Sequence, residues 1–261
     1  MTLSRGLLAL VATVLAAAPT TLAKSVQPKT LPTYFKLCER DSANFSECIA
    51  ESVNLLRPYL ENGIRPFRIP PLNPLSLEEV SIDEGMGPVS INLKLTKLSV
   101  EGGQNYKVNS VRPELENHKI HFSIDLPLLE MHGDYEMDGR ALVLPIRGKG
   151  KADINVYNIS PNATLIGKPV YRNGVKYMEL EDFPVSIGPA KLVKLNFGNL
   201  FGGNKQLGDN MNRFLNDNWK EVMDELRPII ENVVSAFLIS ASKGIFHTVP
   251  FDSLFPETKS D

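Results

Sequence analysis

Between residues 89 and 197, apolar and polar side chains alternate with a period of two, most clearly over residues 120–126. Such alternation predicts antiparallel strands with one apolar and one polar face. In the long segment 140–157, Gly148 and Gly150 fall on the apolar face, where glycine allows sharp curvature or the close approach of another backbone. We therefore expect a bent antiparallel sheet whose apolar face is covered by another element.

Two dipeptides mark turns within this region. Asp138-Gly139 and Asn173-Gly174 are both typical of two-residue hairpin turns, because these residues tolerate a positive φ. We expect a hairpin at each, and residues 192–197 to form the last strand of the series.

The segment that covers the sheet is predicted at residues 209–243. Its apolar residues recur at helical spacing within an arc of about 100°, and they are Met211, Leu215, Trp219, Val222, Leu226, Ile229, Ile230, Val233 and Phe237. A helix of this length measures about 50 Å at a rise of about 1.5 Å per residue. Pro228 on the polar side predicts a bend, and Lys243-Gly244 predicts the end of the helix. The combined prediction is an elongated α+β domain in which a strongly curved antiparallel sheet wraps a long, bent amphipathic helix.

Two further elements precede the sheet. Residues 46–62 have helical periodicity, and Pro58 is expected to kink or split that helix. Residues 64–75 contain four prolines, which predicts an extended connector.

The first 23 residues have the features of a secretory signal peptide. Arg5 gives a basic start, Gly6–Ala18 an apolar run, and small residues precede a cleavage point before Lys24. The run is too short to span about 30 Å of hydrocarbon, and we expect no later stretch to reach that length. We expect residues 24–261 to form one secreted, extracellular domain.

Secretion determines how the cysteines are interpreted. In an oxidising compartment, a Cys38–Cys48 disulfide is favoured over metal binding or catalysis. Three sequons become candidate glycosylation sites, at Asn44, Asn158 and Asn162.

No motif for catalysis, metal binding or a cofactor is found. The net charge of −2 disfavours a nucleic-acid partner, and Gly-x-Ser-x-Gly, His-Glu-x-x-His and Walker-type patterns are absent from the sequence. His118 and His121 are three apart in a strand-like pattern, which predicts that they face opposite ways. We expect no enzyme, no metal and no cofactor.

The sequence resembles the insect takeout / juvenile-hormone-binding protein family along most of its length. The matching features, in order, are Cys38 and Cys48, Asn62-Gly63-Ile64, Ile69–Leu75, Leu126-Pro127, Gly133-Asp134-Tyr135, Gly139–Gly150, Asn199–Gly203, Phe214–Trp219, Pro250, Leu254 and Phe255. The resemblance implies a hydrophobic tunnel between helix and sheet, and a carrier of isoprenoid or fatty ligands in extracellular fluid. Because hormone-binding members typically have a second disulfide, this chain is more similar to the takeout branch, some of whose members are under circadian or feeding control.

Twelve residues are predicted to line the ligand-binding interior, with Tyr135 and Trp219 as possible hydrogen-bond donors to the ligand. They are Phe122, Ile124, Tyr135, Leu142, Leu144 and Ile146 from the sheet, and Leu215, Trp219, Val222, Leu226, Val233 and Phe237 from the helix. The alternatives are a secreted signalling glycoprotein with a closed interior that binds a receptor, and a lipid hydrolase. We expect a monomer.

Overall fold

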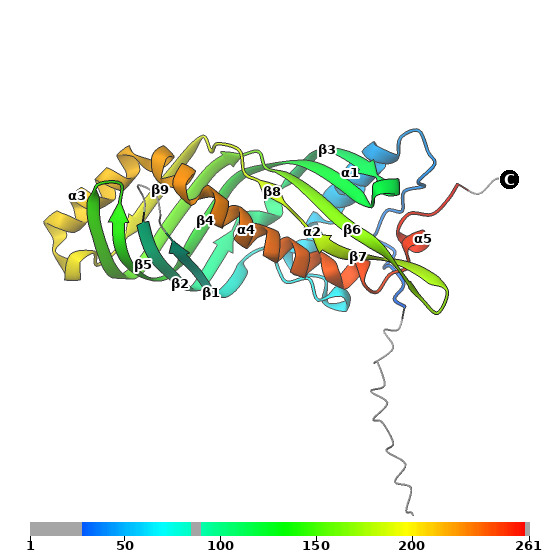
Figure 1. The fold of residues 1–261 in the computed structure, drawn as a ribbon, viewed down its shortest axis with the longest axis horizontal. Helices are drawn as coiled ribbons and strands as arrows, with labels where there is room; N and C mark the ends of the chain where they lie inside the picture. The colour runs from blue at the N-terminus through cyan, green and yellow to red at the C-terminus, as the bar shows by residue number, and fades with distance from the viewer. Residues whose placement is uncertain (1–27, 85–89, 259–261) are drawn as a thin grey trace, which may run out of the picture.

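The computed structural model describes residues 28–84 and 90–258, so the expected signal peptide, residues 1–23, lies outside the described residues. A large antiparallel sheet curls around a long C-terminal helix and stays open along one side (Figure 1). The strands of the described residues are β1 (Leu75–Glu84), β2 (Ser90–Glu101), β3 (Lys107–Glu114), β4 (Lys119–Ala141), β5 (Leu144–Ile159), β6 (Asn162–Arg172), β7 (Val175–Asp182), β8 (Val185–Ser186) and β9 (Leu192–Phe197). The predicted α+β fold class is confirmed.

Strand β4 passes through both halves of the sheet. Its first part pairs with β3 and β6, and its later part pairs with β2 and β5. Apolar positions are even-numbered as far as Leu126 and odd-numbered from Leu129, with Pro127 between them. The sequence therefore shows two alternating runs where the structure has a single strand of 23 residues.

One of the two predicted hairpin turns is wrong. Asp138-Gly139 lies inside β4, and the chain turns at Leu142-Val143. Gly139 is needed for a tertiary reason, because a Cβ atom there would lie 2.1 Å from the backbone oxygen of Ser90 in β2. The turn at Asn173-Gly174 is confirmed, and it joins β6 to β7.

The predicted close approach at the inner-face glycines is confirmed. A Cβ atom on Gly148 would lie 2.4 Å from the Tyr135 hydroxyl, and one on Gly150 would lie 2.4 Å from the backbone oxygen of Gly198. Only glycine leaves enough space for these neighbours at the two positions.

The single helix predicted over residues 209–243 is two helices, α3 (Lys205–Asp217) and α4 (Trp219–Phe246). They meet at Asn218, where φ is −114° and ψ is 26°. The predicted end at Lys243-Gly244 is also wrong. Gly244 lies within α4 and packs against a 3₁₀ turn, where a Cβ atom would lie 1.7 Å from the backbone oxygen of Phe67. Pro228 lies inside α4, as expected.

The predicted helix over residues 46–62 is split into α1 (Phe45–Leu55) and α2 (Arg57–Glu61), with Pro58 in the first turn of α2. The connector after it is not simply extended. It contains a 3₁₀ turn, η1 (Arg65–Phe67), closed by a bridge between Ile64 and Ile69. The remaining short helices are η2 (Gly103–Asn105), η3 (Leu115–Asn117), η4 (Phe201–Gly203) and α5 (Phe251–Leu254).

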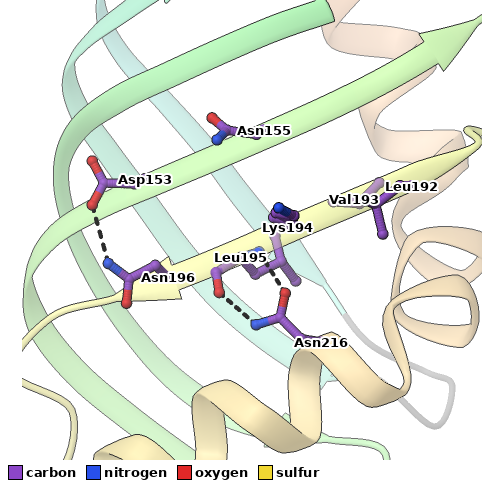
Figure 2. A pocket seen from close by; sticks show the side chains of 8 residues that line it. All are labelled: Asp153, Asn155, Leu192, Val193, Lys194, Leu195, Asn196 and Asn216. Atoms are coloured by element: carbon purple, nitrogen blue, oxygen red, sulfur yellow. Dashed lines mark hydrogen bonds between the residues drawn. The ribbon is translucent and has the colours of Figure 1, made fainter.

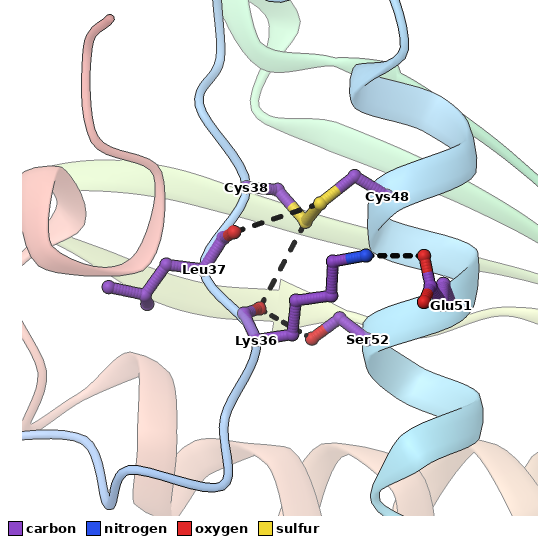
Figure 3. Close-up of polar contacts among 6 residues, drawn as sticks. All are labelled: Lys36, Leu37, Cys38, Cys48, Glu51 and Ser52. Carbon is purple, nitrogen blue, oxygen red and sulfur yellow. Dashed lines mark hydrogen bonds and ion pairs between the residues drawn. A yellow bond between two sulfur atoms is a disulfide. The ribbon is translucent and has the colours of Figure 1, made fainter. Parts of the chain in front are cut away.

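The disulfide between Cys38 and Cys48 is present, and it joins the N-terminal segment to α1 (Figure 3). Beside it, Lys36 forms an ion pair with Glu51 of α1, and the Ser52 hydroxyl donates to the Lys36 carbonyl at 2.7 Å. The N-terminal segment is therefore attached to α1 by covalent and polar contacts together.

Within residues 28–84 and 90–258, the buried apolar residues form three clusters. The first core cluster lies between α3, the start of α4 and the half of the sheet containing β1, β2, β5 and β9. The second core cluster lies between α1, α5, β3, β6 and β7. The third is small and centres on Phe67 and Val249. Leu126 of β4 packs against both the first and the second, so it connects them.

Helix α4 is long and apolar enough to cross a membrane by length and composition alone, contrary to the expectation from the sequence. In the fold it lies along the sheet, where it contacts β7, β8 and β9. Val222 and Leu226 of α4 are buried in the first core cluster. We therefore interpret α4 as the helix that covers the sheet.

Candidate functional site

The apolar stripe of α4 is buried near the start of the helix and only partly buried beyond it. Near the start, Val222 and Leu226 are buried in the first core cluster, whereas Leu238, further along, is itself partly exposed where it packs against the second. Between them, Val233 and Phe237 continue the stripe at helical spacing but belong to none of the three clusters, and both are partly exposed. The centre of α4 thus presents apolar surface that the core does not fully cover.

The middle of β4 shows the same pattern. Phe122, Ile124, Leu129 and Met131 on its apolar positions are all partly exposed, whereas Ile120 at the start of the strand is 2% exposed. Partly exposed apolar side chains therefore occur on both the sheet and the helix, between the two large core clusters.

The structure places the twelve predicted lining residues in four groups. Tyr135, Ile146, Leu215, Val222 and Leu226 are buried in the first core cluster. Leu142 and Trp219 are partly buried against that cluster, and Phe122 and Ile124 against the second. Val233 and Phe237 are partly exposed outside the clusters, and Leu144, predicted to face inward, is 37% exposed beside the β4–β5 turn.

Tyr135 is not placed to bond a ligand. It is 2% exposed, and its hydroxyl already donates to the Gly198 carbonyl at 2.8 Å. Its ring packs edge-on against Phe197, with 5.0 Å between centroids. Burial raises the pKa of this phenol to about 12. We therefore assign Tyr135 to the core and correct its predicted role as a donor to the ligand.

Trp219 lines a pocket at the edge of the sheet. The pocket has a volume of about 260 Å³ and lies between β5, the segment between β8 and β9, and the first turns of α4. Its lining residues are Val156, Ile159, Ile187, Gly188, Pro189, Ala190, Lys191, Trp219, Lys220, Met223, Asp224, Arg227 and Ile230. Val156 and Ile159 are buried members of the first core cluster, so the pocket reaches from charged surface residues to the apolar interior.

Two side chains of α4 hold one end of this pocket in place. Glu231 accepts a hydrogen bond from the backbone N–H of Ile187 at 2.7 Å, and Arg227 donates to the carbonyl of the same residue. Arg227 is also paired with Asp224. We call the two contacts that Glu231 and Arg227 make with the Ile187 backbone the Ile187 clamp. No pattern in the sequence pointed to it, because both residues resemble ordinary charged positions on a helix surface.

A second pocket, of about 460 Å³, lies over β5 and β9 (Figure 2). It is surrounded by polar side chains including Asp153, Asn155, Lys194 and Asn196. Along β9, Lys194 and Asn196 are exposed while Val193 and Leu195 are buried, and all four line the pocket together with Asn216 of α3, so the pocket lies at the edge where β9 meets α3. None of the twelve predicted lining residues lines this pocket.

The histidines lie outside both pockets. His118 follows η3 with a φ of 53° and so precedes β4, while His121 lies within β4 and bonds Thr164 at 2.9 Å. Burial lowers the pKa of His118 and of His247, with Lys176 and Arg172 respectively adding to the effect. Among the residues that the structure describes, no group of three or more His, Cys, Asp or Glu side chains could hold a metal ion.

A sheet curled around a long helix, with apolar side chains incompletely packed between them and a pocket that reaches them from outside, defines a class of elongated proteins with an apolar interior. A family model described as haemolymph juvenile hormone binding protein matches residues 8–256. The chain belongs to this family, which includes the takeout proteins.

Known relatives are distant in sequence but similar in length. The circadian clock-controlled protein daywake of Drosophila melanogaster is 24% identical over 236 residues, covering 86% of this chain and 88% of daywake. A putative beta-carotene-binding protein of Schistocerca gregaria is 22% identical over 222 residues, covering 82% and 85%. The crystal structure of Takeout 1 from Epiphyas postvittana superposes with a TM-score of 0.74 at 23% identity, covering 85% of this chain and 99% of Takeout 1. That structural similarity confirms the fold.

Proposed function

We propose that this protein is a carrier that binds a small hydrophobic molecule between α4 and the curled sheet. The observation that carries the proposal is the row of partly exposed apolar side chains at the centre of α4 and β4, which a fully packed core would have buried. The bound ligand would cover Phe122 and Ile124 on the sheet, and Val233 and Phe237 on the helix. In this proposal the interior is a tunnel, as the family resemblance implies.

The binding energy would come from apolar burial. Each CH₂ group moved from water into an apolar environment gains about 0.8 kcal/mol, so a long ligand needs few polar contacts. A ligand such as an isoprenoid or a fatty molecule fits this requirement. The family description and the printed name of the Schistocerca relative, which refers to beta-carotene, support this class of ligand.

We further propose that the protein is secreted after removal of residues 1–23. The disulfide supports this proposal because such bonds persist in oxidising compartments. Asn44, Asn158 and Asn162 are all exposed, as glycosylation requires. A circadian or feeding-related role is proposed on the similarity to daywake and is not needed for the binding activity.

The binding proposal is tested with the mature protein, residues 24–261, purified from a secreting cell line. Native mass spectrometry is expected to show a co-purifying lipid or, after delipidation, stoichiometric uptake of an added one. In a series of fatty alcohols that differ only in chain length, affinity is expected to rise about fourfold for each added CH₂ until the interior is full. A protein that takes up neither lipids nor apolar dyes would support the alternative of a closed signalling glycoprotein. Turnover of a bound ester would support the hydrolase alternative.

A further inference from the structure

The helices α3 and α4 run beside the edge of the sheet formed by β9 and the segment before it. Side chains of the helices bond the backbone of this edge at three positions, using Asn212 at Phe197, Asn216 at Leu195, and the Ile187 clamp. At each position, the helix side chains bond both the N–H and the C=O of one edge residue, as a neighbouring strand would. We call the line along which the two helices meet this edge the seam. Polar contacts close the seam at one end, at Leu195 and Phe197, and at the other end, at Ile187.

Between its two bonded ends, the seam as described here lacks such contacts at residues 188–191. In the part of the chain that the structure describes, no hydrogen bond joins α4 to residues 188–191, and the pocket at Trp219 opens there. The backbone of Lys191 bonds instead to β5, through the Tyr157 carbonyl at 2.9 Å. The preceding residues, Gly188, Pro189 and Ala190, have small side chains, so little bulk separates the surface from Val156 beneath.

The size of the pocket is informative about its use. Sites that enclose a whole small molecule usually measure about 300–1,000 Å³. At about 260 Å³, this pocket accommodates one end of a long apolar molecule rather than all of it. Its inner wall includes Val156 and Ile159, and Ile230 of α4 also lines it, three positions before Val233 on the same helix.

We propose that the opening between residues 187–191 and the first turns of α4 is the port through which long aliphatic or polyene ligands enter and leave. Residues 187–191 form its movable wall, and the Ile187 clamp holds that wall closed. This inference rests on the proposed carrier function. Because Arg227 and Glu231 hold backbone rather than ligand, loosening the clamp changes the rates of uptake and release together and leaves the affinity nearly unchanged.

The test is stopped-flow exchange of N-phenyl-1-naphthylamine, an apolar dye, on the disulfide-bonded mature protein. Glu231→Ala, which removes the acceptor for the Ile187 N–H, is expected to raise both association and dissociation rates at least threefold, with Kd within twofold of the parent. Glu231→Gln keeps an acceptor oxygen and is expected to restore the parent rates. Ala190→Trp, which fills the mouth of the pocket, is expected to slow both rates at least fivefold.

The control is Asn212→Ala, which opens the seam at Phe197, away from the pocket, and is expected to exchange dye at the parent rates. Each variant is first checked by circular dichroism and urea unfolding so that rates are compared between folded proteins. If the parent binds the dye but Glu231→Ala and Ala190→Trp exchange it at parent rates, the port is overturned and the carrier function stands. If the parent binds neither dye nor lipid, both proposals fall.

Discussion

Asn216 of α3 forms two hydrogen bonds with the backbone of Leu195 in β9 (Figure 2). Its Nδ2 donates to the Leu195 carbonyl at 2.7 Å, and its Oδ1 accepts from the Leu195 N–H at 2.9 Å. In the other half of the sheet, Asn54 of α1 pairs in the same way with Val108 of β3, both contacts measuring 2.9 Å. Asparagine side chains on helices thus take the place of a neighbouring strand at two exposed edges, which would otherwise be open to pairing with another chain.

Replacing Asn216 with alanine is expected to lower the free energy of unfolding by about 1–3 kcal/mol, because it leaves a partly buried N–H and C=O without partners. Urea unfolding of the purified protein measures the change. Asn196→Ala is the matched control, since Asn196 is an exposed residue of β9 whose side chain bonds the side chain of Asp153, and it is expected to change stability by less than about 0.5 kcal/mol. Equal losses in the two variants would contradict the strand-like role of Asn216.

The inner-face glycine at position 148 is expected to be intolerant of any side chain. Gly148→Ala forces a methyl group toward the Tyr135 hydroxyl and Leu200, and overpacking of this kind typically costs about 1–3 kcal/mol. Gly198→Ala is the control, because its added Cβ would meet nothing closer than 3.5 Å. Thermal unfolding of both variants is the measurement. If Gly148→Ala is as stable as Gly198→Ala, the close contact of position 148 with Tyr135 and Leu200 does not require glycine.

The sequence was sufficient for features that depend on local pattern. Alternation predicted the curled antiparallel sheet, Asn173-Gly174 predicted a turn because both residues accept a positive φ, and the apolar stripe predicted the covering helix. The family resemblance added the expected class of ligand, isoprenoid or fatty molecules, which local pattern does not specify.

Tertiary contacts account for the predictions that were wrong. Glycine after aspartate is common in turns, but at position 139 glycine is required because the Ser90 backbone approaches too closely for a Cβ atom. Gly244 resembles a helix end, but it is required by contact with Phe67. Among the predicted lining residues, alternation identified Tyr135 as inward-facing without indicating that Gly198 accepts its hydrogen bond. The Ile187 clamp was missed because it bonds backbone, which has no sequence signature.

His247 is expected to make stability fall as the pH is lowered. Arg172 donates to both its Nδ1, at 2.8 Å, and its carbonyl, at 2.5 Å. Burial, together with the neighbouring Arg172 and Lys243, lowers its pKa, while Glu179 opposes the shift. Below an unfolded-state pKa of about 6.5, the unfolded chain therefore binds the proton more readily, and stability falls as the pH drops through the folded-state value.

The measurement is urea unfolding between pH 7.5 and 5 for the parent and for His247→Asn, whose side-chain oxygen can still accept from Arg172. The variant is expected to lose less stability across this range. The remaining slope is expected from other groups whose pKa is lowered in the folded protein, His118 by burial and, toward pH 5, carboxyls such as Asp153 beside His132. Parallel curves for the parent and His247→Asn would exclude His247 as a source of the pH dependence.

Removing the disulfide is expected to destabilise the protein by about 2–4 kcal/mol, because the bond restricts the unfolded chain. Cys38→Ala with Cys48→Ala is the variant to use, since Cys38 is only 3% exposed and alanine keeps an apolar side chain there. Limited proteolysis is expected to cleave first in the N-terminal segment that the bond attaches to α1. Unchanged stability would mean that the Lys36 and Ser52 contacts are sufficient to hold that segment.

Stability and affinity are expected to respond differently at two positions on the helices, and this difference separates the ligand-binding surface from the core. Leu215 is 2% exposed in the first core cluster, so Leu215→Ala should cost about 2–5 kcal/mol of stability while changing Kd for an apolar ligand by less than about twofold. Phe237 is partly exposed and outside the clusters, so Phe237→Ala should cost about 1 kcal/mol and weaken binding at least about fivefold, because the side chain contributes apolar contact to the ligand. Urea unfolding without ligand and dye titration well below the unfolding midpoint give the two quantities separately. If Phe237→Ala loses stability as Leu215→Ala does and keeps its affinity, the centre of α4 is core, and the ligand must bind elsewhere.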